Sequence, residues 1–395
     1  MLNIDLGSGG EGYVSLKSVS WNAASSALVS TAMDAVNGVA LQRAADDVVV
    51  SVTLDNATGK LWMQATSFDA AGDVDVEGTP VEVMTVSADR AWAFAATTNA
   101  GYFVVIGATD ANTVTAKSYT RSGTTMTLDA TDTETVTGYA EELVYALCGG
   151  SATRLMAVIP HDTATGRRRA HGITVGSGSV AFDASGTHII ASTSDDPGGY
   201  GRSGLVRKDA DEYVFFGADS SSGDCAASHI LDNGSGTPPT VGSAGVMSIN
   251  IGEVYGYCGM IAPDASAVAC VAMDSAYVTF SGAASLSGST ITAIDAGYGG
   301  CPNLPAQAIA LPDMLADKFQ FIMATRGVGT GDYPGVEFGE VDTTNLRVRF
   351  GYNIDNTDGK PGVYDGDVCA LTTTRFIHAY PKTSTGYPTL RSFDI

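Results

Sequence analysis

A short apolar run that follows a polar turn recurs seven times along this chain, at intervals of 51 to 58 residues. The runs begin at Val48, Tyr102, Leu155, Tyr213, Val268, Phe319 and Phe376. Self-similarity at a period of this order is typical of a propeller or a solenoid, in which each repeat is one supersecondary unit. Because the repeats are long and their patterning is that of strands, the sequence favours propeller blades over solenoid rungs.

The repeat around Tyr102 shows how one blade is built. Four segments of strand-like composition follow one another at 92–96, 102–106, 114–120 and 124–128. The third is rich in β-branched and aromatic residues, which favour strands. Ser122-Gly123 separates the third segment from the fourth, and glycine suits such a turn because it tolerates positive φ. Four short antiparallel strands of this kind form one propeller blade.

The last repeat contains segments for three strands only, and the chain then ends. The segment Leu2–Leu6 offers a fourth strand, which would close the ring and remove exposed strand edges. We therefore expect a single all-β domain over 1–395, a seven-bladed β-propeller of four-stranded antiparallel blades closed by the N-terminal strand. The expected blades span approximately 38–86, 90–137, 141–185, 201–250, 255–297, 305–352 and 366–395 plus 2–8.

The charge balance is strongly acidic, with 43 Asp and Glu against 21 Lys and Arg and a net charge of −22. Nucleic-acid binding needs a basic surface, and docking on anionic lipid needs basic residues, so both are disfavoured. No run of 18 apolar residues is present, and we expect no membrane insertion. The start of the chain lacks the basic and apolar regions of a secretory signal, which predicts synthesis in the cytoplasm.

Motifs that carry catalytic or cofactor chemistry are missing from the sequence. It contains no G-x-S-x-G, no P-loop, no H-E-x-x-H and no G-x-G-x-x-G. The five histidines have no spacing suited to a structural zinc site. His378 lies within an expected strand and is interpreted as a structural residue. We therefore expect no catalytic residue, no cofactor and no enzymatic activity.

One basic cluster stands out in the acidic chain, at residues 167–171. On a strand, Arg167, Arg169 and His171 would share one face, because side chains alternate between faces. These three residues are the candidate site for a ligand or partner, such as an anionic glycan or an acidic protein, since guanidinium groups suit carboxylates and phosphates. The alternative is a solvated strand that pairs with acidic neighbours.

A second candidate is a cluster of acidic residues that could hold Ca²⁺ through oxygen ligands. Its members are Asp355, Asp358, Asp365 and Asp367. The spacing does not match an EF-hand, and a turn rich in Asp and Asn is the alternative.

The repeats also carry a recurring local pattern of a Thr-Arg turn, an apolar strand, a Gly-containing turn and a Thr-rich strand. It is found in the stretches 374–380 and 385–393, and again in 114–120 followed by 121–125. This pattern resembles the degenerate propeller repeats of bacteriophage and prophage virion proteins, which are often tail-associated. The resemblance implies a virion component that decorates a particle or contacts a host surface, and it supplies no catalytic set.

From these observations we expect a non-enzymatic structural or adhesive component of a phage-like virion, such as a tail fibre, spike or decoration protein. Expected partners are other virion proteins and a host-surface glycan or protein, and a homo-oligomer is left open. The expected contact regions are the long connections at 9–37, 180–207 and 353–367, because loops on a rigid scaffold carry recognition. Two alternatives remain: a carbohydrate-active propeller enzyme or lectin, and a cellular protein-interaction scaffold.

Overall fold

The computed structural model describes most of the chain. The described residues are 2–4, 14–16, 20–21, 38–55, 57–88, 91–136, 145–162, 167–183, 186–189, 204–218, 224–250, 254–274, 279–293, 297–298, 304–315, 317–326, 334–355, 366–381 and 388–395. Across these residues the secondary structure is entirely β, which confirms the expected fold class. They contain no helix that is long and apolar enough to cross a membrane.

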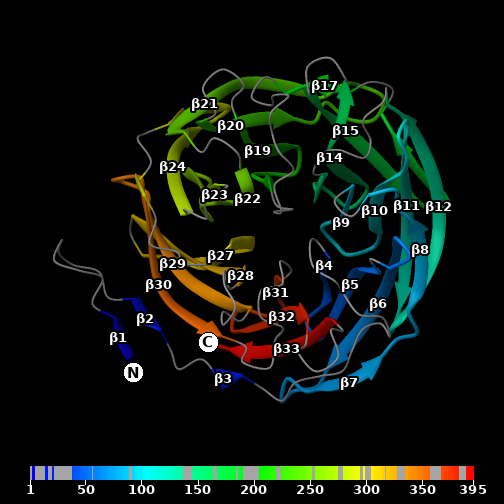
Figure 1. The fold of residues 1–395 in the computed structure, drawn as a ribbon, viewed down its shortest axis with the longest axis horizontal. Helices are drawn as coiled ribbons and strands as arrows, with labels where there is room; N and C mark the ends of the chain where they lie inside the picture. Colours follow the sequence, from blue (N-terminus) through cyan, green and yellow to red (C-terminus); the bar gives the residue numbers. More distant parts are fainter. Residues whose placement is uncertain are drawn as a thin grey trace.

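Seven antiparallel sheets stand around one axis as the blades of a propeller (Figure 1). Blade 1 contains β4 (Val39–Ala45), β5 (Val48–Asp55), β6 (Lys60–Phe68), β7 (Val74–Glu77) and β8 (Val81–Thr85). Blade 2 contains β9 (Trp92–Ala96), β10 (Phe103–Asp110), β11 (Thr113–Ser122) and β12 (Thr125–Thr135). Blade 3 contains β13 (Ala146–Gly149), β14 (Arg154–Asp162), β15 (Arg167–Gly176), β16 (Ser179–Phe182) and β17 (Thr187–His188).

Blades 4 to 7 follow in chain order. Blade 4 contains β18 (Leu205–Arg207), β19 (Glu212–Ala218), β20 (Asp224–Leu231) and β21 (Thr240–Asn250). Blade 5 contains β22 (Val254–Ile261), β23 (Ala267–Asp274), β24 (Thr279–Ser287), β25 (Thr290–Ala293) and β26 (Gly297–Tyr298). Blade 6 contains β27 (Leu304–Leu315), β28 (Lys318–Arg326), β29 (Gly335–Asp342) and β30 (Arg347–Asp355). Blade 7 contains β31 (Asp367–Ala370), β32 (Arg375–Pro381) and β33 (Pro388–Asp394).

The first strands of the blades surround the axis of the ring. Each contacts the first strand of the next blade, in the closed order β4, β9, β13, β18, β22, β27, β31 and back to β4. In blades 1, 3 and 5 the outermost strand is split in two, since β7 and β8, β16 and β17, and β25 and β26 share one partner strand each. The basic unit is therefore the four-stranded blade that the repeat predicts.

The second strand of each blade explains why the apolar run was the clearest repeat marker. These strands are β5, β10, β14, β19, β23, β28 and β32, and β5 is buried along its whole length. Both faces of a second strand pack against neighbouring blades, so the strand starts with consecutive apolar residues, as Val48–Val50 does in β5. Seven hydrophobic clusters, one at each interface between adjacent blades, form the core of the described residues.

The segment that closes the ring differs from the expected one. Leu2–Ile4 (β1) pairs with Val14–Leu16 (β2) in a separate two-stranded sheet. The fourth strand of blade 7 is Ser20–Trp21 (β3), which pairs with β33 through Ser20 opposite Asp394 and Trp21 opposite Phe393. The N-terminal region thus closes the ring as expected, but the prediction that residues 2–8 supply the strand is wrong.

Polar contacts join the two ends of the chain across the interface between blades 7 and 1, which we call the seam. The backbone N–H of Leu41 in β4 donates to Oδ2 of Asp367 in β31, at 2.6 Å. The hydroxyl of Ser392 in β33 donates to the carbonyl oxygen of Gly72 in the turn after β6. An apolar cluster that includes Leu41, Val49, Ile377 and other residues of both blades packs in the same interface.

Candidate functional site

A pocket of about 390 Å³ lies beside the seam, among blades 6, 7 and 1. Its lining residues are Arg43, Asp46, Ile309, Ala310, Leu311, Ala370, Thr372, Thr373 and Phe376. This volume falls within the range of about 300–1,000 Å³ that is typical of small-molecule sites. We call it the seam pocket. Blades 1 and 7 contribute residues at or beside the turn between their first and second strands, and blade 6 contributes three residues of β27.

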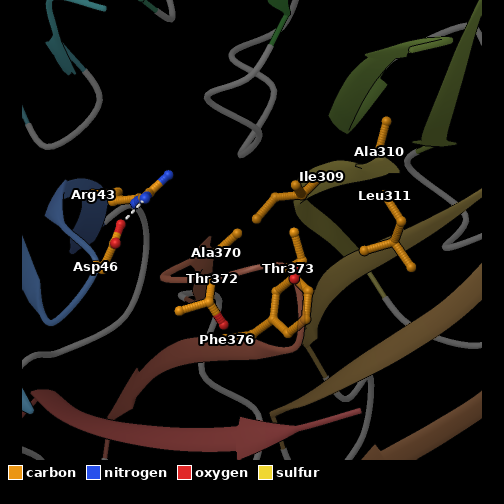
Figure 2. A pocket seen from close by; sticks show the side chains of 9 residues that line it. All are labelled: Arg43, Asp46, Ile309, Ala310, Leu311, Ala370, Thr372, Thr373 and Phe376. Carbon is orange, nitrogen blue, oxygen red and sulfur yellow. Dashed lines mark hydrogen bonds and ion pairs between the residues drawn. The ribbon is translucent and has the colours of Figure 1, made fainter. Parts of the chain in front are cut away.

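The seam pocket has a polar side and an apolar side (Figure 2). Arg43 of β4 and Asp46 of the turn that follows form an ion pair. Ile309 and Leu311 of β27 face them from the other side, and the residues of blade 7 lie between. Thr372 and Thr373 are exposed, whereas Leu311 and Phe376 are buried. The pocket therefore offers charged groups and hydroxyls above an apolar floor.

The ion pair of the pocket is well solvated, because 51% of the Arg43 side chain and 81% of the Asp46 side chain are exposed. A solvated pair of this kind contributes at most about 1 kcal/mol to stability. A ligand could therefore take over the hydrogen-bonding capacity of either group at little energetic cost to the fold. The guanidinium supplies donors and the carboxylate supplies acceptors, so together they match a hydroxyl group, which is both.

The turn that carries the two threonines is tightly held. The backbone N–H groups of Leu371 and Thr372 donate to the carbonyl oxygen of Arg375, at 2.9 and 3.1 Å. The Thr372 hydroxyl accepts from the backbone N–H groups of Thr374 and Arg375, at 3.2 and 3.0 Å. A threonine hydroxyl that accepts from backbone N–H groups just after it is a common turn device. The local sequence thus fixes this side of the pocket.

Blade 3 carries a close repeat of this hairpin. Cys148 aligns with Cys369, Thr153-Arg154 aligns with Thr374-Arg375, and Pro160 aligns with Pro381. The turn hydrogen bonds repeat as well, with Gly150 and Ser151 donating to the carbonyl oxygen of Arg154 at 2.9 and 3.1 Å. Burial raises the pKa of the Cys148 and Cys369 thiols to about 12, so both are neutral thiols that pack as small apolar groups.

The repeated hairpin differs where the pocket would form. Gly149 replaces Ala370, and a Cβ built on Gly149 would lie 2.0 Å from the carbonyl oxygen of Ala96 in blade 2. Thr98 of blade 2 also donates its backbone N–H to the carbonyl oxygen of Ser151, at 3.2 Å. Blade 2 therefore packs directly on blade 3, whereas the methyl group of Ala370 lines an open space. We attribute the seam pocket to this difference.

The basic cluster expected to bind a ligand lies in β15 of blade 3, away from the residues that line the seam pocket. His171 is wholly buried, and its ring lies edge-on to Phe182 with centroids 6.2 Å apart. Arg169 is half-buried, with Nη2 3.0 Å from Nε2 of His188. Arg168 is buried, and its guanidinium lies over the ring of Phe215 at 5.6 Å. For Arg167 only the strand position is described, and a ligand site at Arg167, Arg169 and His171 stays a prediction.

The calcium candidate falls mostly outside the described residues, which do not include Asp358 or Asp365. Asp355 ends β30, and its side chain is not described. Asp367 is buried, and its carboxylate accepts from the backbone N–H groups of Leu41 and Val368. No group of three or more metal-ligating side chains was found among the described residues. A calcium site in this region therefore stays a prediction.

His378 is wholly buried in β32, as its position in an expected strand suggested. Its ring stacks on Tyr380 with centroids 5.2 Å apart. Burial, together with the positive charge of Arg391, lowers the pKa of His378 to about 3. The side chain is therefore a neutral imidazole in the core at ordinary pH.

Sequence reasoning missed the residues of the seam pocket, although it singled out the turns that carry them. The pocket residues of blades 1 and 7 lie in or beside the polar turns that precede the apolar runs at Val48 and Phe376. The expected contact regions were instead the connections between blades, which begin and end at the opposite end of the strands. The missed signal was Arg43, a basic residue of an acidic chain beside one of these turns.

Comparison with known proteins found no matching family model and no matching curated sequence. Solved structures with a similar fold include a Burkholderia pseudomallei lectin, at 10% identity and a TM-score of 0.60, covering 93% of this chain and 98% of the lectin. A periplasmic gluconolactonase of Pseudomonas aeruginosa matches at 12% identity and a TM-score of 0.54, covering 88% and 96% of the two chains. An α-L-arabinanase of Penicillium chrysogenum matches at 9% identity and a TM-score of 0.50, covering 95% and 98%.

At these identities the likeness establishes the fold of the chain. It also contradicts two expectations from the sequence, namely a structural virion component and the absence of enzymatic activity. The similar structures are a lectin and two enzymes named for sugar substrates. The resemblance to phage repeats, the partners and the virion location stay predictions.

Proposed function

We propose that this chain is a carbohydrate-active propeller that holds a neutral sugar, or the lactone of a sugar, in the seam pocket. The observation that carries the proposal is the pairing of Arg43 and Asp46 opposite an apolar wall. Sugars present hydroxyl groups on their rim and C–H groups on their faces. The ion pair suits the hydroxyls, and Ile309, Leu311 and Phe376 suit the C–H faces.

A neutral ligand fits the charges better than an anionic one. The positive charge of Arg43 is already balanced by Asp46, and the chain as a whole carries a net charge of −22. An acidic ligand would approach against this field, while a neutral sugar would not. Two neighbouring hydroxyls could each accept from Arg43 and donate to Asp46 or to the hydroxyl oxygen of Thr373.

For a reaction, the lining residues fit the opening of a sugar lactone better than the cleavage of a glycosidic bond. Most glycosidases use two carboxylates that flank the bond, and Asp46 is the one carboxylate among the residues that line the pocket. For a lactone, Asp46 would take a proton from water as it attacks the ring carbonyl. Arg43 would stabilise the oxyanion, and the proton would pass to the leaving ring oxygen as the C–O bond breaks.

Binding to an array of neutral mono- and disaccharides tests the first part of the proposal. We expect the wild-type chain to bind, and binding to fall at least 10-fold in Arg43→Ala, which removes the ion pair. It should fall as much in Ala370→Leu, which fills the pocket without altering the ion pair. Arg347→Ala, on the exposed face of β30, is a control that should bind normally. Absence of binding by the wild-type chain, or full binding by Ala370→Leu, would refute the proposed site.

The reaction is tested separately with D-glucono-1,5-lactone, by titrating the acid released above the spontaneous rate. We expect turnover that Asp46→Asn reduces by at least 100-fold, since general-base catalysis contributes about 10²–10⁴-fold. Sugar binding without lactone turnover would support the proposed binding site and refute the proposed lactonase reaction.

A further inference from the structure

The arginine that ends the blade 7 turn, Arg375, makes contacts on both sides of the seam. Nε and Nη2 donate to the two carboxylate oxygens of Asp394, at 2.7 and 3.0 Å, in a bidentate pair within blade 7. Nη1 donates to the carbonyl oxygens of Asp69 and Ala70 in blade 1, at 3.2 and 2.9 Å. One guanidinium therefore joins the last blade to the first.

The same residue holds the turn that lines the seam pocket. Its backbone carbonyl oxygen accepts from Leu371 and Thr372, and its backbone N–H donates to the Thr372 hydroxyl. Thr372 and Thr373 form the blade 7 side of the pocket, while Arg43 and Asp46 come from blade 1. Arg375 thus links the blade 7 turn, which forms one wall of the pocket, to blade 1, which supplies Arg43 and Asp46 on the other wall.

We propose that Arg375 is a positioning residue for the seam pocket, and that ligand binding depends on the seam being closed by its guanidinium. The inference rests on the proposed function, because it concerns the same pocket. Its physical basis is that Arg43 and Thr372 belong to different blades, so their separation is set by the contacts across the seam. A ligand that touches both walls binds well only when that separation is fixed.

Blade 3 supplies a matched control. Arg154, which aligns with Arg375, binds Asp183 of its own blade at 2.8 Å and also pairs with Asp232 of blade 4 through Nε at 2.9 Å. Both partners are buried, and both arginines lie partly buried at the start of a second strand. Arg154 therefore performs the same structural task at an interface that does not border the seam pocket.

The test compares Arg375→Ala with Arg154→Ala on the full chain, using the neutral sugar array and thermal unfolding. We expect both variants to unfold at lower temperature, and only Arg375→Ala to lose 10-fold or more of its array binding. Arg375→Lys, which keeps the charge next to Asp394 but lacks the guanidinium fork, should recover part of the binding. If Arg154→Ala loses as much binding as Arg375→Ala, or if neither loses any, Arg375 has no positioning role.

A measurement without any sugar makes the result independent of the array. Backbone amide exchange should accelerate in the turn 371–375 and in the turn 69–73 of Arg375→Ala, and should stay unchanged there in Arg154→Ala. Absence of array binding by the wild-type chain would refute the proposed function. Normal exchange in both turns of Arg375→Ala would refute the positioning role even if the wild-type chain binds sugar.

Discussion

The backbone N–H of Leu41 donates to the carboxylate of Asp367 over 2.6 Å, although 326 residues separate the two along the chain. This hydrogen bond joins the first strand of blade 1 to the first strand of blade 7 at the innermost part of the ring. Both residues are buried, so the amide of Leu41 has a defined acceptor where solvent has little access. Ring closure is therefore fixed at the axis as well as at the outer strand.

Replacement of Asp367 should weaken the seam. Asp367→Ala removes the acceptor of a buried N–H group, and leaving such a group without a partner costs about 1–3 kcal/mol. We expect the free energy of unfolding, measured with urea, to fall by this amount. Asp367→Asn keeps an acceptor oxygen and should lose less. Equal stability of wild-type chain and Asp367→Ala would show that the hydrogen bond contributes nothing to closure.

Truncation of the N-terminal region distinguishes the strand that closes the ring from the one expected at first. Deletion of residues 1–16 removes β1 and β2 and leaves the pairing of β3 with β33 intact. Deletion of residues 1–21 also exposes the edge of β33. Each backbone hydrogen bond contributes a net free energy of about 0.5–1.5 kcal/mol. Only the longer deletion removes the hydrogen bonds between β3 and β33, so only this deletion should lower the melting temperature by several degrees.

Light scattering provides a second measurement on the same two truncations. An exposed strand edge is a template for pairing with another chain, so the longer deletion should aggregate more readily. The account of closure is wrong if the shorter deletion destabilises the protein as much as the longer one does.

Packing between blades 2 and 3 should be intolerant of a single methyl group. Gly149→Ala would place a Cβ 2.0 Å from the carbonyl oxygen of Ala96, and this backbone atom cannot move away easily. Overpacking of this kind costs about 1–3 kcal/mol. Gly242→Ala is a suitable control, since the nearest atoms to its Cβ would lie at ordinary contact distances of 3.7 Å or more. Thermal unfolding should separate the two variants clearly.

The buried imidazole of His378 should make stability depend on pH. Its pKa is lowered to about 3 in the folded chain, against 6.5 for an ordinary histidine. Between these values the unfolded chain binds a proton that the folded chain does not, so stability is lost as pH falls below 6.5. The loss reaches at most about 1.4 kcal/mol for each pH unit.

The matched variant for this effect is His378→Phe, which keeps a ring beside Tyr380 and cannot titrate. We expect the drop in the free energy of unfolding from pH 7 to pH 5 to be smaller in this variant than in the wild-type chain. Carboxylates titrate in both proteins, so the difference between the two drops isolates His378. Identical drops would mean that His378 does not titrate differently in the folded and unfolded chains.

Much of the architecture could be predicted from the sequence, because second strands are buried on both faces. Such strands begin with an apolar run, as Val48–Val50 does in β5, and the spacing of these runs revealed seven blades. The turns at Gly72, Gly123 and Gly288 were also predictable, since each has positive φ, which glycine adopts without steric cost. Local chemistry therefore determined the number of blades, their strand order and several of their turns.

The closing strand and the seam pocket could not be read in this way. Ser20–Trp21 is too short to show alternation, whereas Leu2–Leu6 alternates well and yet β1 pairs elsewhere. The pocket depends on how closely a neighbouring blade packs on the hairpin. A Cβ on Gly149 would clash with blade 2, whereas the Cβ of Ala370 lines the pocket. These features were decided only in the tertiary structure, because they arise from contacts between blades whose residues lie far apart in the sequence, and no local pattern encodes that distance.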